Sequence, residues 1–335
     1  MPEAGPKSTF SWPLVYDINI KMTTLEEMVR GCYEAAPFPD NLRKAKNFEV
    51  ELQRITDWIK LNLDFLSEDL TKVNFKQILC AGCGTGEEAL ALTRIFPKAK
   101  IDAIDISSES LKIAKGNISK AKAENITLAK LSIINNLPTL KKKYDFIYSA
   151  GVIHHLIDPN KGFKILAKKL GRKGKMVIML YNSYGLFSYK CELLLLDLLS
   201  LGNFRKRLGL VKRLGLSKGK NKVLVYDSYL NPQVKTFSIE TVASWSKKTN
   251  LKITSVVPPL YFSGLIDYGL AGGEYIFRRK KILAFILSIL EKFSGNRPRV
   301  IQDREMKLPI FRTLFFQLIF LLLGKGECQY LLEAR

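Results

Sequence analysis

Three glycines at alternate positions follow an apolar run, in the order Ile78-Leu79-Cys80-Ala81-Gly82-Cys83-Gly84-Thr85-Gly86. When a strand runs into such a turn and a helix follows, the backbone can come close to a ligand and the helix N–H groups point at it. Nineteen residues after Gly86, Asp105 ends a second apolar run. An acid there can accept hydrogen bonds from ribose hydroxyls. These residues predict a site for a nucleoside-containing cofactor.

The glycine spacing separates two classes of nucleoside cofactor. A dinucleotide site has the spacing G-x-G-x-x-G. Here Gly82, Gly84 and Gly86 alternate, and Glu87 occupies the third glycine position of the dinucleotide pattern. The spacing therefore disfavours a nicotinamide dinucleotide.

The two histidines of the chain are adjacent, His154 and His155, just after a predicted strand. An unperturbed histidine titrates near about pH 6.5, so either one could act as a general base, or one could satisfy loop backbone groups. We favour His154 as the base. Tyr181, at the end of the next strand, is a candidate for the substrate wall or for ordinary packing at the sheet edge.

Five cysteines are scattered along a chain without a recognisable secretory leader, which leads us to expect a reducing, cytoplasmic setting. Cys80 and Cys83 have C-x-x-C spacing, but a structural zinc site would need two more ligands from His154 and His155. We interpret the two cysteines as small residues at a crowded turn, and we expect no metal.

Alternating strand and helix patterns position these residues. They predict a Rossmann-like, doubly wound α/β fold with a mostly parallel sheet and helices on both faces. The expected strands are Gln77–Ala81, Lys100–Asp105, Ile126–Ile133, Tyr144–Ala150, Lys175–Tyr181 and Leu251–Val257, and the expected helices cover about 87–96, 108–122, 160–170 and 239–249. The glycine turn then lies at the carboxyl edge of the sheet, where open α/β sheets bind ligands.

Residues 78–181 resemble the core of a class I S-adenosylmethionine-dependent methyltransferase, most closely a bacterial subgroup with an A-G-C-G-T-G turn and a G-V-[IL]-H-H motif at the fourth strand. The resemblance is carried by Ala81-Gly82-Cys83-Gly84-Thr85-Gly86, Ala103-Ile104-Asp105-Ile106-Ser107, Tyr144-Asp145-Phe146-Ile147-Tyr148-Ser149-Ala150-Gly151-Val152-Ile153-His154-His155-Leu156 and Gly174-Lys175-Met176-Val177-Ile178.

The resemblance implies S-adenosylmethionine as the cofactor and a role for each matching position. The glycines would let the backbone approach the methionine and ribose, Asp105 would hold the ribose hydroxyls, and Ser149 to Gly151 would line the sulfonium and the substrate entrance. The implied cofactor-binding residues are Ala81, Gly82, Cys83, Gly84, Gly86, Asp105, Ile106, Ser132, Ile133, Ser149, Ala150 and Gly151.

Two positions depart from the family pattern. Many relatives carry an acid at the end of strand one, where this chain has Cys80. Many also carry an aspartate after strand three that contacts the adenine amino group, whereas residues 131–136 hold no acid. Ser132 or Asn135 could make a neutral hydrogen bond there instead.

Additions flank the predicted core of residues 71–258. We expect residues 1–70 to form a cap, in which Tyr33 and Phe38 could fold over the cofactor as a lid or form a fixed turn. We expect residues 259–335 to form a helical, apolar extension. Its apolar blocks are shorter than the about 20 residues that span a bilayer. We expect buried helices or a dimer interface there, with peripheral membrane association as the alternative.

The formal net charge is +22, with 38 lysines and 15 arginines. This charge permits RNA, anionic lipid headgroups or acidic metabolites as partners. Within a basic insertion at about 182–225, the stretch 205–222 holds eight lysines or arginines and no acid. We expect a solvated, flexible loop there, because Gly209, Gly215 and Gly219 weaken a helix. RNA and an anionic membrane surface are alternative contacts for it.

The sequence therefore predicts an enzyme that transfers a methyl group from S-adenosylmethionine to a small-molecule or lipid-like acceptor by in-line displacement. One alternative is an RNA or tRNA methyltransferase that uses the basic surface. The other is a non-catalytic protein that binds the cofactor or serves as a scaffold. We expect a cytoplasmic protein, with contact to the inner face of the membrane as a further alternative.

Overall fold

A seven-stranded sheet forms the centre of the chain in a computed structural model, which describes residues 24–260, 310–323 and 326–335. The strand order is β3-β2-β1-β4-β5-β7-β6, and only β7 runs antiparallel to its neighbours. The strands are β1 Gln77–Ala81, β2 Lys100–Asp105, β3 Ile126–Lys130, β4 Tyr144–Ala150, β5 Leu170–Tyr181, β6 Leu251–Val257 and β7 Glu327–Ala334. The predicted Rossmann-like, mostly parallel sheet is confirmed.

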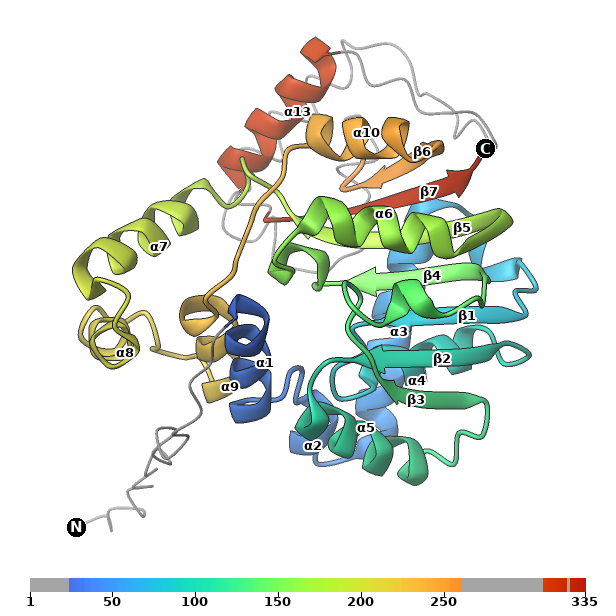
Figure 1. Ribbon diagram of the computed structural model, residues 1–335, viewed down its shortest axis with the longest axis horizontal. Coiled ribbons are helices and arrows are strands. Elements are labelled where there is room, and N and C mark those ends of the chain that lie inside the picture. Colours follow the sequence, from blue (N-terminus) through green and yellow to red (C-terminus); the bar gives the residue numbers. More distant parts are fainter. Residues whose placement is uncertain (1–23, 261–309, 324–325) are drawn as a thin grey trace, which may run out of the picture.

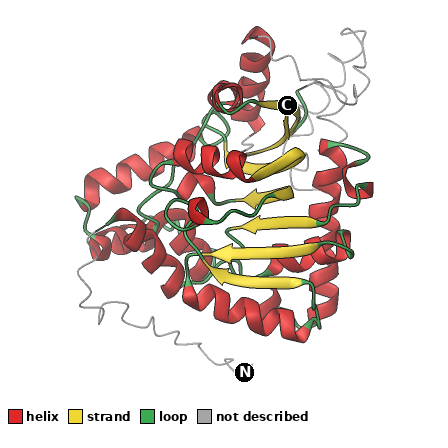
Figure 2. Cartoon of the chain, turned by 45° about the vertical axis from the view of Figure 1, so that its right-hand side comes forward, coloured by secondary structure: helices red, strands yellow, loops and turns green. Residues whose placement is uncertain are grey.

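Helices cover both faces of the sheet (Figure 2). One face packs against α3 Phe48–Leu66, α4 Glu87–Ile95 and α5 Ser108–Lys120, and the other against α6 Pro159–Lys169, α10 Ile239–Lys248 and α13 Ile310–Leu323. The central strands are buried on both faces, which explains why they read as continuous apolar runs.

A second group of helices lies beyond the carboxyl ends of the parallel strands (Figure 1). It comprises α1 Leu25–Ala35, α2 Asn41–Lys44, α7 Phe187–Ser200, α8 Phe204–Arg213, α9 Lys222–Val225 and a π-helical turn, η4, at Tyr226–Leu230. Short 3-10 helices also occur in the described residues, at η1 Leu70–Lys72, η2 Leu137–Thr139 and η3 Ile153–His155. The cap helix α1 contacts both α5 and η4, so it bridges the core and the added helices.

The end of the chain differs from the predicted helical extension. Residues 327–334 form β7, which is inserted between β5 and β6, so that the predicted last strand, β6, reaches the sheet only through β7. Six consecutive residues of β7 are buried. A strand of this kind is held by pairing with segments far away in the sequence, which a local pattern does not reveal.

The basic segment also differs from the expected flexible loop, because residues 204–213 form α8. The side chain of Asn203 caps this helix, and Val211 is fully buried against the added helices. This packing offsets the cost of Gly209 within the helix. Gly215 and Gly219 do adopt positive φ, in the turns that follow.

One of the apolar blocks in the C-terminal extension, Thr313–Leu323, lies in α13, where Phe316, Ile319 and Phe320 are buried against the sheet. The other block, Ile282–Leu290, lies outside the described residues, as do the basic residues 278–281 that precede it. Within the described ranges, no helix combines the length and apolar character needed to cross a membrane. Peripheral membrane contact stays a prediction.

Candidate functional site

The glycine turn connects β1 to α4 through three residues with positive φ: Gly82 at +81°, Gly84 at +51° and Gly86 at +85°. A Cβ added to Gly84 would lie 2.1 Å from the carbonyl oxygen of Phe38 in the cap. Both the backbone conformation and this close approach require glycine at position 84. The turn therefore presents its backbone at the carboxyl edge of the sheet and is packed against the cap.

Asp105 ties the end of β2 to this turn. One carboxylate oxygen accepts a hydrogen bond from the Gly84 N–H at 2.8 Å, and the other accepts one from the Ser107 N–H at 2.9 Å. Burial raises the pKa of Asp105, and the backbone hydrogen bonds oppose that rise. A carboxylate has about four lone-pair sites, so Asp105 can still accept hydrogen bonds from a ligand.

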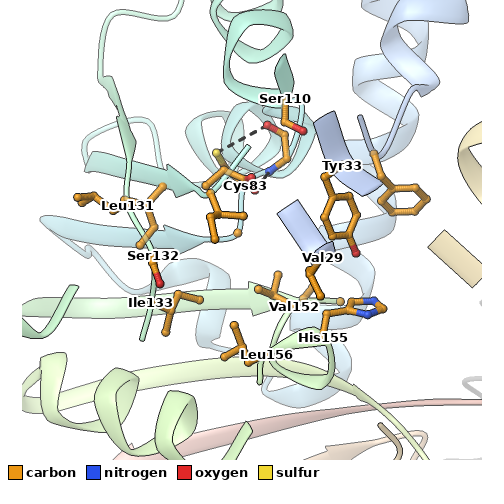
Figure 3. A pocket seen from close by; sticks show the side chains of 18 of the residues that line it. Val29, Tyr33, Cys83, Ser110, Leu131, Ser132, Ile133, Val152, His155 and Leu156 are labelled. Carbon is orange, nitrogen blue, oxygen red and sulfur yellow. Dashed lines mark hydrogen bonds between the residues drawn. The ribbon is translucent and has the colours of Figure 1, made fainter. Parts of the chain in front are cut away.

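A cavity of about 160 Å³ lies at this edge, between the ends of the parallel strands and the cap. Figure 3 shows Val29 and Tyr33 of α1 opposite Cys83, Ser132 and Val152. Nine of the twelve implied cofactor-binding residues line it: Gly82, Cys83, Gly84, Asp105, Ile106, Ser132, Ile133, Ala150 and Gly151. The other three lie behind the lining, where the Ser149 hydroxyl donates to the Ala81 carbonyl at 3.0 Å and Gly86 caps α4.

Glu88, in the first turn of α4, is a cavity residue that sequence reasoning missed. Its Oε2 atom is buried and accepts no hydrogen bond from the described residues. Burial, together with the charges of Glu87 and Asp105, raises the pKa of Glu88 to about 8. The signal that could have found it is an acid one residue into the helix after a ligand-binding turn.

Glu26, in the cap helix α1, is the second cavity residue that sequence reasoning missed. Its carboxylate accepts hydrogen bonds from the Ser132 hydroxyl and from Asn135 Nδ2, the latter at 2.6 Å. Ser132 and Asn135, the neutral groups predicted after β3, therefore bind a carboxylate. Glu26 precedes them in the sequence by 106 and 109 residues respectively.

The two histidines occupy different environments. His155 lines the cavity, whereas His154 is fully buried behind it with its ring stacked on Tyr181 at a centroid distance of 3.9 Å. Neither ring nitrogen of His154 has a hydrogen-bond partner among the described residues. Burial lowers its pKa well below the ordinary value. The cavity thus brings together His155 and the glycine turn, but neither His154 nor Tyr181.

His155 has a defined orientation. Its Nδ1 lies 2.7 Å from the Gln233 carbonyl oxygen, and its Nε2 lies 3.7 Å from Asp227 Oδ1. Asn231 Nδ2 also lies 3.1 Å from Nδ1. Because the shorter contact is to a carbonyl oxygen, which only accepts, we assign the proton of the neutral ring to Nδ1, which leaves Nε2 unprotonated. Burial lowers the pKa of His155, and the charge of Asp227 opposes this. Tyr33 also donates to Asp227 at 2.9 Å, which links the cap to the same group.

Comparisons with known proteins agree with this geometry. A family model described as "Methyltransferase domain" matches residues 73–199. An uncharacterised protein of Synechococcus is 38% identical over 110 residues, which cover 32% of this chain and 26% of that protein. Malonyl-[acyl-carrier protein] O-methyltransferase 1 of Ilyobacter polytropus is 30% identical over 120 residues, which cover 36% of this chain and 43% of the enzyme. The chain therefore matches less than half the length of these curated relatives.

Among solved structures, PKMT2 from Rickettsia typhi superposes with a TM-score of 0.52 at 17% identity, over 82% of this chain and 54% of that one. At this identity the similarity concerns the fold. The family match, the shared fold and the glycine turn with Asp105 lead to one assignment. Residues 73–199 form the core of a class I S-adenosylmethionine-dependent methyltransferase domain.

Proposed function

We propose that this chain transfers a methyl group from S-adenosylmethionine to a small-molecule or lipid-like acceptor. The observation that carries the proposal is the cavity beneath the cap, where the backbone of the glycine turn and the carboxylate of Asp105 meet. When bound, the cofactor supplies a methyl group on an already activated sulfonium. The protein then needs to position the acceptor in line with that methyl group and to exclude water.

The residues at the cavity suit this cofactor chemically. Gly82 and Gly84 allow close approach of the backbone, and Asp105 offers acceptors for the ribose hydroxyls. In volume, about 160 Å³ is close to the about 150 Å³ that accepts a benzene molecule, and the cofactor is several times larger than benzene. Because Val29 and Phe38 of the cap line this cavity, we infer that the cap shifts outward as the cofactor enters.

The apolar character of the cavity, which lies between the sheet edge and the cap, supports a small or lipid-like acceptor. Apolar side chains from four separate segments face it, including Val29, Ile133, Val152 and Met179. A nucleic-acid groove would instead combine exposed cations with aromatic stacking platforms. The match to an O-methyltransferase that acts on a malonyl group carried by a protein supports the same acceptor class.

If the acceptor must lose a proton, His155 would take it. Its Nε2 is the unprotonated nitrogen of a neutral ring, while Nδ1–H donates to the Gln233 carbonyl. Asp227, 3.7 Å from Nε2, would stabilise the imidazolium that forms. A base in this position contributes by removing the proton as the new bond to the methyl carbon forms.

The experiment is titration calorimetry on the full chain with S-adenosylmethionine and S-adenosylhomocysteine. We expect both to bind, and we expect Asp105→Asn to weaken both by about tenfold, because it replaces a charged acceptor with a neutral one. Methyl-labelled cofactor would then be offered with small-molecule, lipid and RNA fractions, and label should enter one of the first two. No binding by the wild type, or label confined to RNA, would overturn the proposal.

A further inference from the structure

We propose, on the basis of the proposed function, that Glu26 of the cap helix α1 recognises the exocyclic amino group of the cofactor's adenine. The carboxylate that the end of β3 lacks would then come from a separate element. The inference rests on the order of the strands, the lining of the cavity next to β3 and the way Glu26 is held.

The order β3-β2-β1-β4 fixes how a nucleoside can lie along the sheet edge. The glycine turn follows β1, and Asp105 ends β2 next to it. With the ribose at Asp105, the amino-acid portion lies over the glycine turn on the β1 side. The base then extends from the ribose toward the β3 side. That direction leads to the residues after β3.

The β3 side of the cavity suits a purine. Leu131, Ile133 and Ile134 provide apolar contact, and Ser132 provides a hydroxyl. Of the three acids among the described lining residues, Asp105 is at β2 and Glu88 is in α4, so Glu26 is the acid on this side. An ionised carboxylate only accepts hydrogen bonds, and the adenine amino group only donates them, so the two are complementary.

Glu26 is held in place from two sides. Ser132 and Asn135 donate to its two oxygens, which leaves about two of its four lone-pair sites for a ligand. The other end of α1 is fixed by Glu34, which accepts from the Ser108 N–H at 2.8 Å and the Glu109 N–H at 2.9 Å at the start of α5. A helix N-terminus favours such an anion. The acid therefore has a defined position while the cap is docked.

The test compares two ligands that differ only on the edge of the base formed by N1 and the substituent at position 6. S-adenosylhomocysteine carries an amino group at position 6 of the purine, and S-inosylhomocysteine carries an oxygen there and a proton on the neighbouring N1. The oxygen would place an acceptor against the Glu26 carboxylate where the amino group had placed a donor. We expect the wild-type full chain to bind the adenosyl form at least about tenfold more tightly in calorimetry. In Glu26→Gln the amide can accept from the amino group or donate to the oxygen, so the affinity ratio should fall towards one. Glu26→Ala, a second variant, should also lower the ratio.

Glu34→Gln is the matched control, because it lies on the same helix and touches α5 rather than the cavity. It should weaken both ligands equally and keep the wild-type ratio. If Glu26→Gln and Glu26→Ala behave like Glu34→Gln, Glu26 only fastens the cap and this inference is overturned, while the proposed function stands. If the wild type binds neither ligand, the proposed function fails and this inference fails with it.

Discussion

Replacing Glu88 with glutamine should remove most of one pH-dependent contribution to folding stability. Burial raises the pKa of Glu88 from an ordinary 4.5 to about 8. Between these two pH values the folded chain keeps a proton that the unfolded chain has released. Stability is therefore highest below the unfolded pKa, falls as pH rises through this window, and levels off above the folded pKa.

The size of the effect follows from the width of the window. Each pH unit inside it costs about 1.4 kcal/mol for one group. Allowing for half-titration near pH 8, the ligand-free protein should lose about 2 kcal/mol of unfolding free energy through Glu88 between pH 6 and pH 8. Burial also raises the pKa of Glu87 and of Asp105, so their contributions have the same sign and remain in the variant.

The assay is urea unfolding of the ligand-free full chain at pH 6 and pH 8, for the wild type and for Glu88→Gln. The difference between the two proteins isolates Glu88, provided that the m-values agree. Glu109→Gln, an exposed acid in the first turn of α5, is the control and should follow the wild type. If the Glu88→Gln and wild-type stabilities change in parallel between the two pH values, the carboxyl is not held protonated and the reasoning is refuted.

Three further predictions concern the same site. Binding of S-adenosylhomocysteine at pH 7 should release close to one proton, because the ammonium group of the ligand's amino-acid portion, bound over the glycine turn, favours ionised Glu88; calorimetry in buffers of different ionisation enthalpy should show this release in the wild type and not in Glu88→Gln. Gly84→Ala should lower the melting temperature and abolish ligand binding, since its Cβ would meet the Phe38 carbonyl at 2.1 Å; a normal melting curve would contradict this. For an acceptor that must be deprotonated, His155→Gln should lower kcat by about 10²-fold or more and His154→Gln should not match it; equal losses would argue against His155 as the base.

The centre of the fold was predictable because its signals are local. The bounds of β1, β2 and β4 agree with those expected, since each is a short apolar run closed by a turn or a helix start. The glycine turn and Asp105 were found the same way. β7 was not found, because its place between β5 and β6 depends on pairing with residues about 150 and 80 positions away along the chain, such as Ile178 and Val256 with Tyr330.

The site, like the fold, contains residues that local sequence patterns reveal and residues that they do not. The sequence lacks acids at the end of β1 and after β3, where Cys80 and Ser132 stand. The structure brings carboxylates to the cavity from helices instead, Glu88 from α4 and Glu26 from α1. Which way an acid on a helix points depends on how that helix packs, so spacing along the strands could not reveal either residue.

These two acids differ in one respect that matters for function. Glu88 belongs to the core and stays at the cavity whatever the cap does, whereas Glu26 reaches it only while α1 is docked through Ser132, Asn135 and the contact of Glu34 with α5. If the cap undocks to admit the cofactor, the core groups are in place before Glu26. Recognition of the base then coincides with closure of the cap, and closure excludes the water that methyl transfer must avoid.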